Sequence, residues 1–295
     1  MITSKTIGSK AASTLIYLIV TVMALSCLLP LINMVAISFS DNAAASANLV
    51  GLVPVNFTLV SYNKLVGESQ FIRSFIISVI RVVLGTSINI LLILTMAYPL
   101  SKTRQEFKSH DIYMNLLIFA MLFSGGMIPL YLTVKNLRLS DSIWALILPG
   151  AVPIFSVILL MNFFRGVPKS LEEAALIDGA GVWTVLFRIF VPVSLPAIAT
   201  VTLFAVVGHW NDYLSALIYI KNAEDYPLMT YIQQLSTAID ISTETDPEKI
   251  EEYLKISSRT LNAAKIVVAT VPILCIYPFL QKYFVSGIVI GSVKE

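Results

Sequence analysis

The sequence predicts an all-α membrane protein with six transmembrane helices. Of its 295 residues, 57% are hydrophobic and 13% are charged, and the mean hydropathy is +0.82. Soluble domains of this length are far less apolar. The apolar residues also form long unbroken runs, whereas a membrane β-barrel would show short alternating segments. Together these two observations place the chain in a bilayer as a helical bundle.

Four runs without any Asp, Glu, Lys or Arg are long enough to span, since a helix needs about 20 apolar residues to cross a hydrocarbon core of roughly 30 Å. They are Ala11–Ser40, Val82–Ser101, Ile112–Val134 and Ser142–Phe164. Two further spans are less uniform, because one contains His209 and Asp212 and the other carries charges near its ends. The expected helices of this single membrane domain, 1–295, are 14–38, 75–100, 112–134, 142–164, 192–220 and 265–285.

The first and third spans have local features of their own. Lys5 and Lys10 precede the first apolar run as in a signal peptide, but the run is too long for one, so we expect a retained anchor. Gly125, Gly126 and Pro129 lie inside the third span, where they should bend or interrupt the helix.

Basic residues suggest the orientation. Their total hardly discriminates between the two sides, but the rule gives most weight to short loops near the spans. The short loop 101–111 is basic, whereas Lys249 and Lys255 lie deep in the long loop 221–262. We therefore expect both termini, the loop 101–111 and the segment around Glu173 to face the cytoplasm.

A polar island, 170–181, interrupts the apolar sequence between the fourth and fifth spans. Ala174 and Ala175 favour a helix, and Ser170 with Glu173 three residues later predicts a capping box. Gly179 and Gly181 predict a tight turn after it. By itself this pattern also fits an ordinary amphipathic helix at the membrane interface.

The spacing within and after this island resembles the loop by which permeases of ATP-binding cassette (ABC) importers dock into their ATPase subunit. The matching residues are Glu173, Ala174, Ala175, Asp178, Gly179, Gly181, Ile189, Val191 and Pro192. Val191 stands where Leu is commoner, a mild departure. Trp210-Asn211-Asp212-Tyr213 and the segment 281–287 are similar to further, less specific stretches of the maltose-type carbohydrate permeases.

The resemblance covers most of the chain and implies a type I ABC importer permease fold in a bacterial cell membrane. It implies half of a translocation pathway, completed by a second permease, with two ATPase subunits and an extracytoplasmic solute-binding protein. The second permease could be an identical copy or a paralogue, and the resemblance favours a paralogue. Glu173, Ala174, Ala175, Asp178, Gly179, Gly181 and Pro192 would couple this chain to the ATPase. ATP and Mg would be bound by those ATPase subunits, and no cofactor by this chain. The complex-oligosaccharide subgroup suggests a cargo derived from plant or algal polysaccharide, acidic ones included.

The loop 221–262 is long and acidic, and long loops are usually functional or disordered. Apolar residues recur in 228–239, and Asp246-Pro247-Glu248 predicts a helix start. The resemblance implies that this loop meets the solute-binding protein, while a solvated insertion without a partner is the alternative.

Polar groups inside the predicted spans are costly and tend to face protein or a wet cavity. The candidates for the translocation path are Arg81, Asn89, His209, Trp210, Asn211, Asp212 and Tyr213, with Trp210 or Tyr213 stacking on a sugar ring. The alternative is structural: Arg81 or Lys265 neutralises Asp212 and the aromatic rings simply pack.

Other function classes find less support. The chain has no phosphate-cradling Gly-Lys-Ser/Thr loop, so we do not expect it to hydrolyse ATP. His110 and His209 fall in different predicted compartments and no Cys/His cluster has metal-ligand spacing, so no metal site and no nucleic-acid partner are expected. A secondary transporter is the main alternative, although no internal repeat is visible. A membrane assembly subunit would not account for the Glu173 motif.

Overall fold

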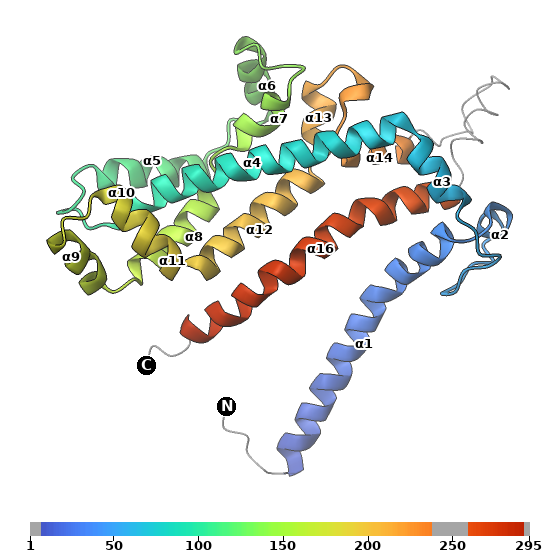
Figure 1. The fold of residues 1–295 in the computed structure, drawn as a ribbon, viewed down its shortest axis with the longest axis horizontal. Coiled ribbons are helices and arrows are strands. Elements are labelled where there is room, and N and C mark those ends of the chain that lie inside the picture. Colours follow the sequence, from blue (N-terminus) through green and yellow to red (C-terminus); the bar gives the residue numbers. More distant parts are fainter. Residues whose placement is uncertain (1–6, 238–258, 292–295) are drawn as a thin grey trace. The chain divides into compact units, whose positions relative to one another are not determined.

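The computed structural model describes residues 7–237 and 259–291. Throughout these ranges the regular structure is helical, and they contain no strand. The chain separates into two compact units, one formed by Met1–Ser69 with Gln234–Thr270 and the other by Gln70–Gln233 with Val271–Glu295. Figure 1 shows the course of the helices.

The first unit contains α1 (Ile7–Ser38), α2 (Asn42–Ser46), α3 (Val60–Gly67) and the beginning of α16 (Arg259–Gly291). Its small core joins Ile37, Ala45 and Ala263. The Asn33 amide donates to the backbone carbonyls of Val50 (3.2 Å) and Gly51 (2.6 Å), which ties the segment after α2 to α1. α1 starts at residue 7 instead of the expected 14.

A covered ion pair completes this unit. Lys265 of α16 is fully buried, and its ammonium lies 2.8 Å from the carboxylate of Glu68, the residue between α3 and α4. A buried lysine requires such a partner, because an isolated charge in an apolar environment is very costly. Lys265 therefore neutralises Glu68, and the suggestion that it neutralises Asp212 was wrong.

The second unit is built around α4 (Ser69–Ser101). Its other helices are α5 (His110–Leu122), α6 (Met127–Asn136), α7 (Ile143–Ile147), η1 (Leu148–Gly150), α8 (Ile154–Arg165), α9 (Lys169–Ile177), α10 (Val182–Val185), η2 (Leu186–Phe190), α11 (Val191–Val193), α12 (Leu195–Asn211), α13 (Leu214–Tyr219), η3 (Ala223–Asp225) and α14 (Leu228–Thr237). Figure 1 shows α9 and α10 beside the carboxyl end of α4 and α13 toward its amino end.

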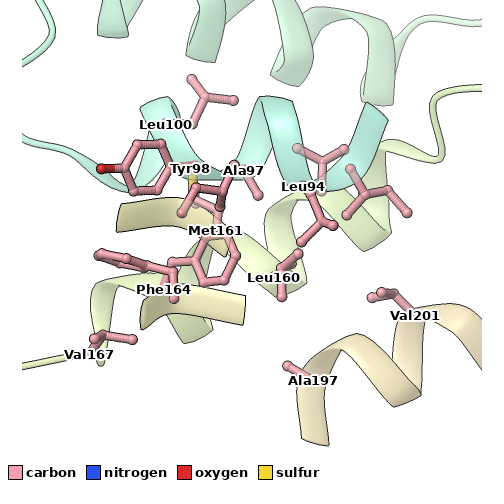
Figure 2. Close-up of a cluster of buried hydrophobic side chains, with 14 of the residues drawn as sticks. Leu94, Ala97, Tyr98, Leu100, Leu160, Met161, Phe164, Val167, Ala197 and Val201 are labelled. Carbon is pink, nitrogen blue, oxygen red and sulfur yellow. The ribbon is translucent and has the colours of Figure 1, made fainter. Parts of the chain in front are cut away.

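Side chains from α4, α8 and α12 form the main core of this unit. Figure 2 shows Leu94 and Ala97 of α4 with Leu160 and Met161 of α8, and Val201 of α12 nearby. Leu160 and Ala97 are fully buried. Small residues such as Ala97 let helix backbones approach closely, which is how helices associate in an apolar solvent.

Three of the expected spans are broken. The third is interrupted between α5 and α6, which meet at 117°, and this confirms the interruption predicted from Gly125 and Gly126. The fourth, expected as one helix over 142–164, is two segments bent by 48° between Gly150 and Ile154, next to Pro149 and Pro153. The two prolines account for this break, because neither can donate a backbone hydrogen bond.

The fifth span is shorter than expected. α12 ends at Asn211, and Asp212 and Tyr213 separate it from α13, so the range 192–220 is not one helix. At its other end α12 meets the segment Val182–Val193 at 86°.

Among the described helices, Ala12–Ser38, Ser69–Ser101 and Arg259–Ile276 are long and apolar enough to cross a membrane. The number rises to six if each of the three bent pairs is one span. α14 occupies most of the apolar-patterned segment 228–239, and the helix start predicted at Asp246 lies outside the described residues.

Candidate functional site

The polar island folds into an elbow made of α9, a turn and α10. Gly179 has φ +79°, a left-handed conformation that disfavours residues with a Cβ. Its N–H donates to the Leu176 carbonyl (3.0 Å) and the Ala180 N–H donates to the Ala175 carbonyl (2.9 Å). This is a Schellman motif, which satisfies the last carbonyls of α9 and reverses the chain.

Two expectations about this elbow were wrong. Pro168 is the N-cap of α9 and provides no side-chain hydrogen bond, while Ser170 lies inside the first turn, so the capping box does not form. Gly181 has φ −75° and nothing within 4 Å of the position a Cβ would take, so its backbone does not require glycine. Gly179 alone makes the turn that was assigned to both.

One face of the elbow exposes large apolar side chains beside acidic ones. Ile177 is 86% exposed, and Leu176, Val182 and Trp183 are each more than half exposed. Glu173, Ala174 and Asp178 are exposed with them, whereas Ala175 is half-buried. Such a concentration of exposed apolar residues on a polar helix marks an interaction surface.

Within the same helix, Glu172 fixes α9 to the end of α4. The Lys102 ammonium, just past α4, lies 2.5 and 2.6 Å from the two carboxylate oxygens of Glu172. The Tyr98 hydroxyl donates to the same carboxylate at 3.3 Å. Lys169 and Glu106 form a second, exposed pair at 3.5 Å. Glu172, and not Glu173, therefore holds the elbow to its own chain.

A groove of about 630 Å³ lies between the elbow and the end of α4. Its walls include Tyr98, Lys102, Glu173, Leu176 and Trp183. Nearby, Glu106 accepts hydrogen bonds from the Thr103 N–H (2.8 Å) and hydroxyl (2.9 Å), and these bonds lower the pKa of its carboxyl group.

Beyond the elbow, η2 is a π-helical turn, a rare form that is common at functional sites. Pro192 follows it in α11 and has no N–H to return the chain to regular helical bonding. Phe190, the last residue of η2, is 3% exposed and packs edge-on against Tyr98 and Phe164.

A second polar site lies toward the amino end of α4, where the fourth and fifth spans are interrupted. Arg81 is 1% exposed, and its guanidinium donates to the Asp212 carbonyl (2.7 Å), to the Leu146 carbonyl (3.2 Å) and to the Asp212 carboxylate. Asp212 also accepts from the Ser215 N–H at 3.1 Å, at the start of α13. Arg81 thus supplies the donors that the interrupted helices lack.

Asn89, two helical turns after Arg81 on α4, supplies donors at the break of the fourth span. Its amide donates to the carbonyls of Gly150 (3.0 Å) and Ala151 (2.8 Å), and its oxygen accepts from the His209 ring at 2.7 Å. Gly85 permits this approach, because a Cβ there would lie 2.5 Å from the His209 ring.

These groups surround a cavity of about 270 Å³. Arg81, Asn89, His209 and Asp212 line it with Ser156 and other residues. Four of the seven path candidates therefore share one cavity. The Arg81–Asp212 pair is also the pair that the structural alternative predicted. These side chains therefore stabilise the interrupted helix ends, independently of any role in transport.

The remaining three candidates lie elsewhere around the α12–α13 break. Trp210 is 4% exposed and packs edge-on against Phe75, with ring centroids 5.9 Å apart. Its ring is covered by protein, as the packing alternative predicted. Asn211 and Tyr213 are exposed, and Tyr213 is 42% exposed.

The elbow and most of the second unit lie in the region that matches a known family. Residues 90–290 match the model of the binding-protein-dependent transport system inner membrane component. The chain belongs to this family. The family consists of transport components of the inner membrane, which agrees with the apolar spans and identifies a non-catalytic membrane subunit.

Several relatives of this permease cover nearly its whole length. It is 42% identical to protein LplC of Bacillus subtilis, over 90% of this chain and 89% of that one. It is 40% identical to the polygalacturonan/rhamnogalacturonan transport system permease YtcP of the same organism, over 95% and 97%. It is 26% identical to the arabinooligosaccharides permease AraQ of Halalkalibacterium halodurans, over 90% of each.

Solved structures agree with the permease fold. A bacterial ABC transporter involved in import of the acidic polysaccharide alginate contains a chain that is 28% identical, with a TM-score of 0.85 over 95% of this permease and 99% of that chain. In a bacterial alginate ABC transporter in complex with its alginate pentasaccharide-bound periplasmic protein, a chain at 15% identity and a TM-score of 0.53 shares the fold.

Sequence reasoning missed Lys102, Tyr98 and Glu172 in this permease. A weak signal was present, because Lys102 is the first charge after the second span and Glu172 immediately precedes Glu173. Nothing local shows that the two, 70 residues apart, form a pair.

Proposed function

We propose that this permease is the transmembrane subunit of an ATP-driven, binding-protein-dependent importer of oligosaccharides. It forms half of the translocation pathway, with a second permease, two ATPase subunits and an extracytoplasmic solute-binding protein. ATP and Mg are bound by the ATPase subunits. Both termini and the elbow face the cytoplasm, and the six spans comprise three continuous helices and three bent pairs.

The observation that carries this proposal is the exposed face of the elbow. Glu173 is exposed there beside Ile177 and Trp183, while its neighbour Glu172 is occupied by Lys102. Exposed apolar side chains beside the exposed carboxylates of Glu173 and Asp178 suit a partner that offers an apolar pocket and a basic group. Docking to an ATPase through Glu173, Ala174, Asp178 and Gly179 uses this face, while the half-buried Ala175 packs α9 against the core behind it. Pro192 lies in α11, just before the helix that would follow the motion of the elbow.

The cargo class is supported by the relatives, whose names specify polygalacturonan or rhamnogalacturonan and arabinooligosaccharides, and by the alginate transporter. We propose an oligosaccharide from plant or algal polysaccharide. The path passes the cavity lined by Arg81, Asn89, His209 and Asp212, and the exposed Tyr213 and Asn211 are its candidates for contact with a sugar.

The test is mass spectrometry of the proteins that co-purify with this chain after gentle detergent extraction from its native membrane. We expect an ATPase, a second permease and a solute-binding protein. Glu173→Ala should reduce recovery of the ATPase, whereas Ser170→Ala, an exposed position on the same helix, should leave it unchanged. Recovery of this chain alone, under conditions that preserve other membrane complexes, would favour a secondary transporter or an assembly subunit instead.

A further inference from the structure

Lys102 occupies the point where three elements of the second unit meet. Its ammonium contacts both oxygens of Glu172 on α9, and it lies 4.3 Å from the ring centroid of Tyr98 on α4. It also lies 4.4 Å from the ring centroid of Phe190 on η2. One side chain thus joins the elbow, the end of α4 and the π-helical turn.

These contacts border the groove but are largely shielded from solvent. The side chains of Lys102 and Glu172 are 14% and 21% exposed, against 68% and 45% for the neighbouring Lys169–Glu106 pair. Ion pairs and cation–π contacts strengthen when water is excluded, so the Lys102 contacts are stronger than the exposed pair. Separating Lys102 from Glu172 would leave two covered charges without partners, which is costly.

The Phe190 ring, one of the two rings that Lys102 contacts, is itself packed against other aromatic rings. Phe190 packs edge-on on Tyr98 (centroids 5.0 Å apart) and on Phe164 of α8 (5.4 Å). Because η2 is a π-helical turn followed by Pro192, its backbone departs from regular α-helical bonding before the 86° bend into α12. A displacement that reaches Phe190 therefore acts where the helix can change its bonding pattern.

We propose that Lys102 is the positioning residue that makes the elbow, the end of α4 and η2 move as one body when the ATPase moves the elbow. This inference rests on the proposed docking of α9 and adds the internal connection by which that motion reaches the spans. If the ion pair and the ring contact are lost, the elbow moves without carrying α12.

The experiment uses the complete transporter, purified with its partners, with Cys27 and Cys275, which are exposed, replaced by serine. One reporter cysteine replaces the exposed Thr184 in the elbow, and in a separate protein another replaces Leu214, 51% exposed at the start of α13. The probe is the rate of maleimide labelling with and without ATP plus vanadate. The variant is Lys102→Met, with Lys102→Arg as the conservative variant and the exposed Lys108→Met as the matched control.

We expect nucleotide to change labelling of both reporters in the parent protein. In Lys102→Met the response at residue 184 should remain, while the response at residue 214 should fall about tenfold. Lys102→Arg and Lys108→Met should keep both responses. An unchanged response at residue 214 in Lys102→Met would overturn the proposal, because a purely structural lysine would alter yield and thermal stability without separating the two reporters.

A second variant keeps the test valid if Lys102→Met does not assemble. Phe190→Leu retains the ion pair and removes one ring, so the response at residue 214 should fall about threefold. Failure of the proposed function would give a different result. No ATPase would co-purify with the parent protein, and the labelling rate at residue 184 in the elbow would not change with nucleotide.

Discussion

Arg81 and Asp212, 131 residues apart, meet at the break between α12 and α13, where the guanidinium binds both the carboxylate and the backbone carbonyl of the aspartate. The same guanidinium donates to the Leu146 carbonyl of α7. One α4 side chain thereby satisfies the ends of two interrupted helices. Within a bilayer, interrupted backbone is tolerated where the protein supplies such partners.

Removing Arg81 should therefore be far more damaging than removing an exposed arginine. Arg81→Met removes the guanidinium from the Asp212 carboxylate and from two carbonyls, and loss of one partner of a buried pair costs about 3–5 kcal/mol. Arg73→Met, which removes an exposed pair with Glu224 and Asp225, should cost about 0–1 kcal/mol. Thermal unfolding of the purified complex measures the effect of each variant. Equal effects would contradict the conclusion that Arg81 stabilises the ends of two interrupted helices.

Asp212→Asn separates the structural role of this residue from transport. Asparagine retains an acceptor for Arg81 but no longer neutralises its buried charge, so assembly should be reduced less than in Arg81→Met. We expect a reduction in transport larger than the reduction in assembly. Normal transport together with normal assembly would remove the case for Asp212 in the translocation path.

Gly85→Ala should displace His209. The new Cβ would lie 2.5–2.8 Å from ring atoms of His209, which breaks the bond to Asn89, and overpacking of this kind costs about 1–3 kcal/mol. Gly208→Ala is the matched control, since a Cβ there has nothing within 4 Å. A double-mutant cycle with His209→Ala should show the coupling, and additive effects would contradict it.

The two glycines of the elbow should differ in their tolerance of alanine. Gly179→Ala places a Cβ on a left-handed residue and should cost about 1–2 kcal/mol, loosening the end of α9. Gly181→Ala should be neutral. Amide hydrogen exchange at residues 179 and 180 measures the difference, and equal exchange in both variants would show that the turn does not depend on Gly179.

Glu106 gives a pH-dependent contribution. Its pKa lies below the ordinary value of 4.5, chiefly because the Thr103 N–H and hydroxyl donate to the carboxylate. A lowered folded-state pKa means that the stabilisation is present above pH 4.5 and is lost as the pH falls through the folded-state pKa. The protection factor of the Thr103 amide, which compares its exchange rate with the intrinsic rate at the same pH, should therefore fall on acidification, and Glu106→Gln should abolish that dependence. A Glu106 variant with the same pH profile as the parent would contradict this assignment.

Much of the elbow and of the third span was predictable because the signals are local. Gly125 and Gly126 predicted the interruption of the third span, and Gly179 predicted the reversal after α9, since each depends on the conformational freedom of the residue itself. The prediction from Ser170 was wrong because capping depends on where the helix begins. The N-cap is Pro168, two residues before Ser170.

The sequence by itself determined that the chain is a helical membrane protein and approximately where its spans lie. Those properties follow from hydrophobicity and spacing within short windows. Only the tertiary structure decided that Arg81 pairs with Asp212, that Lys265 pairs with Glu68, and that Glu172 rather than Glu173 binds Lys102. The partner of a charge in an apolar protein depends on which helix faces meet and where helices break, and no local pattern contains that information.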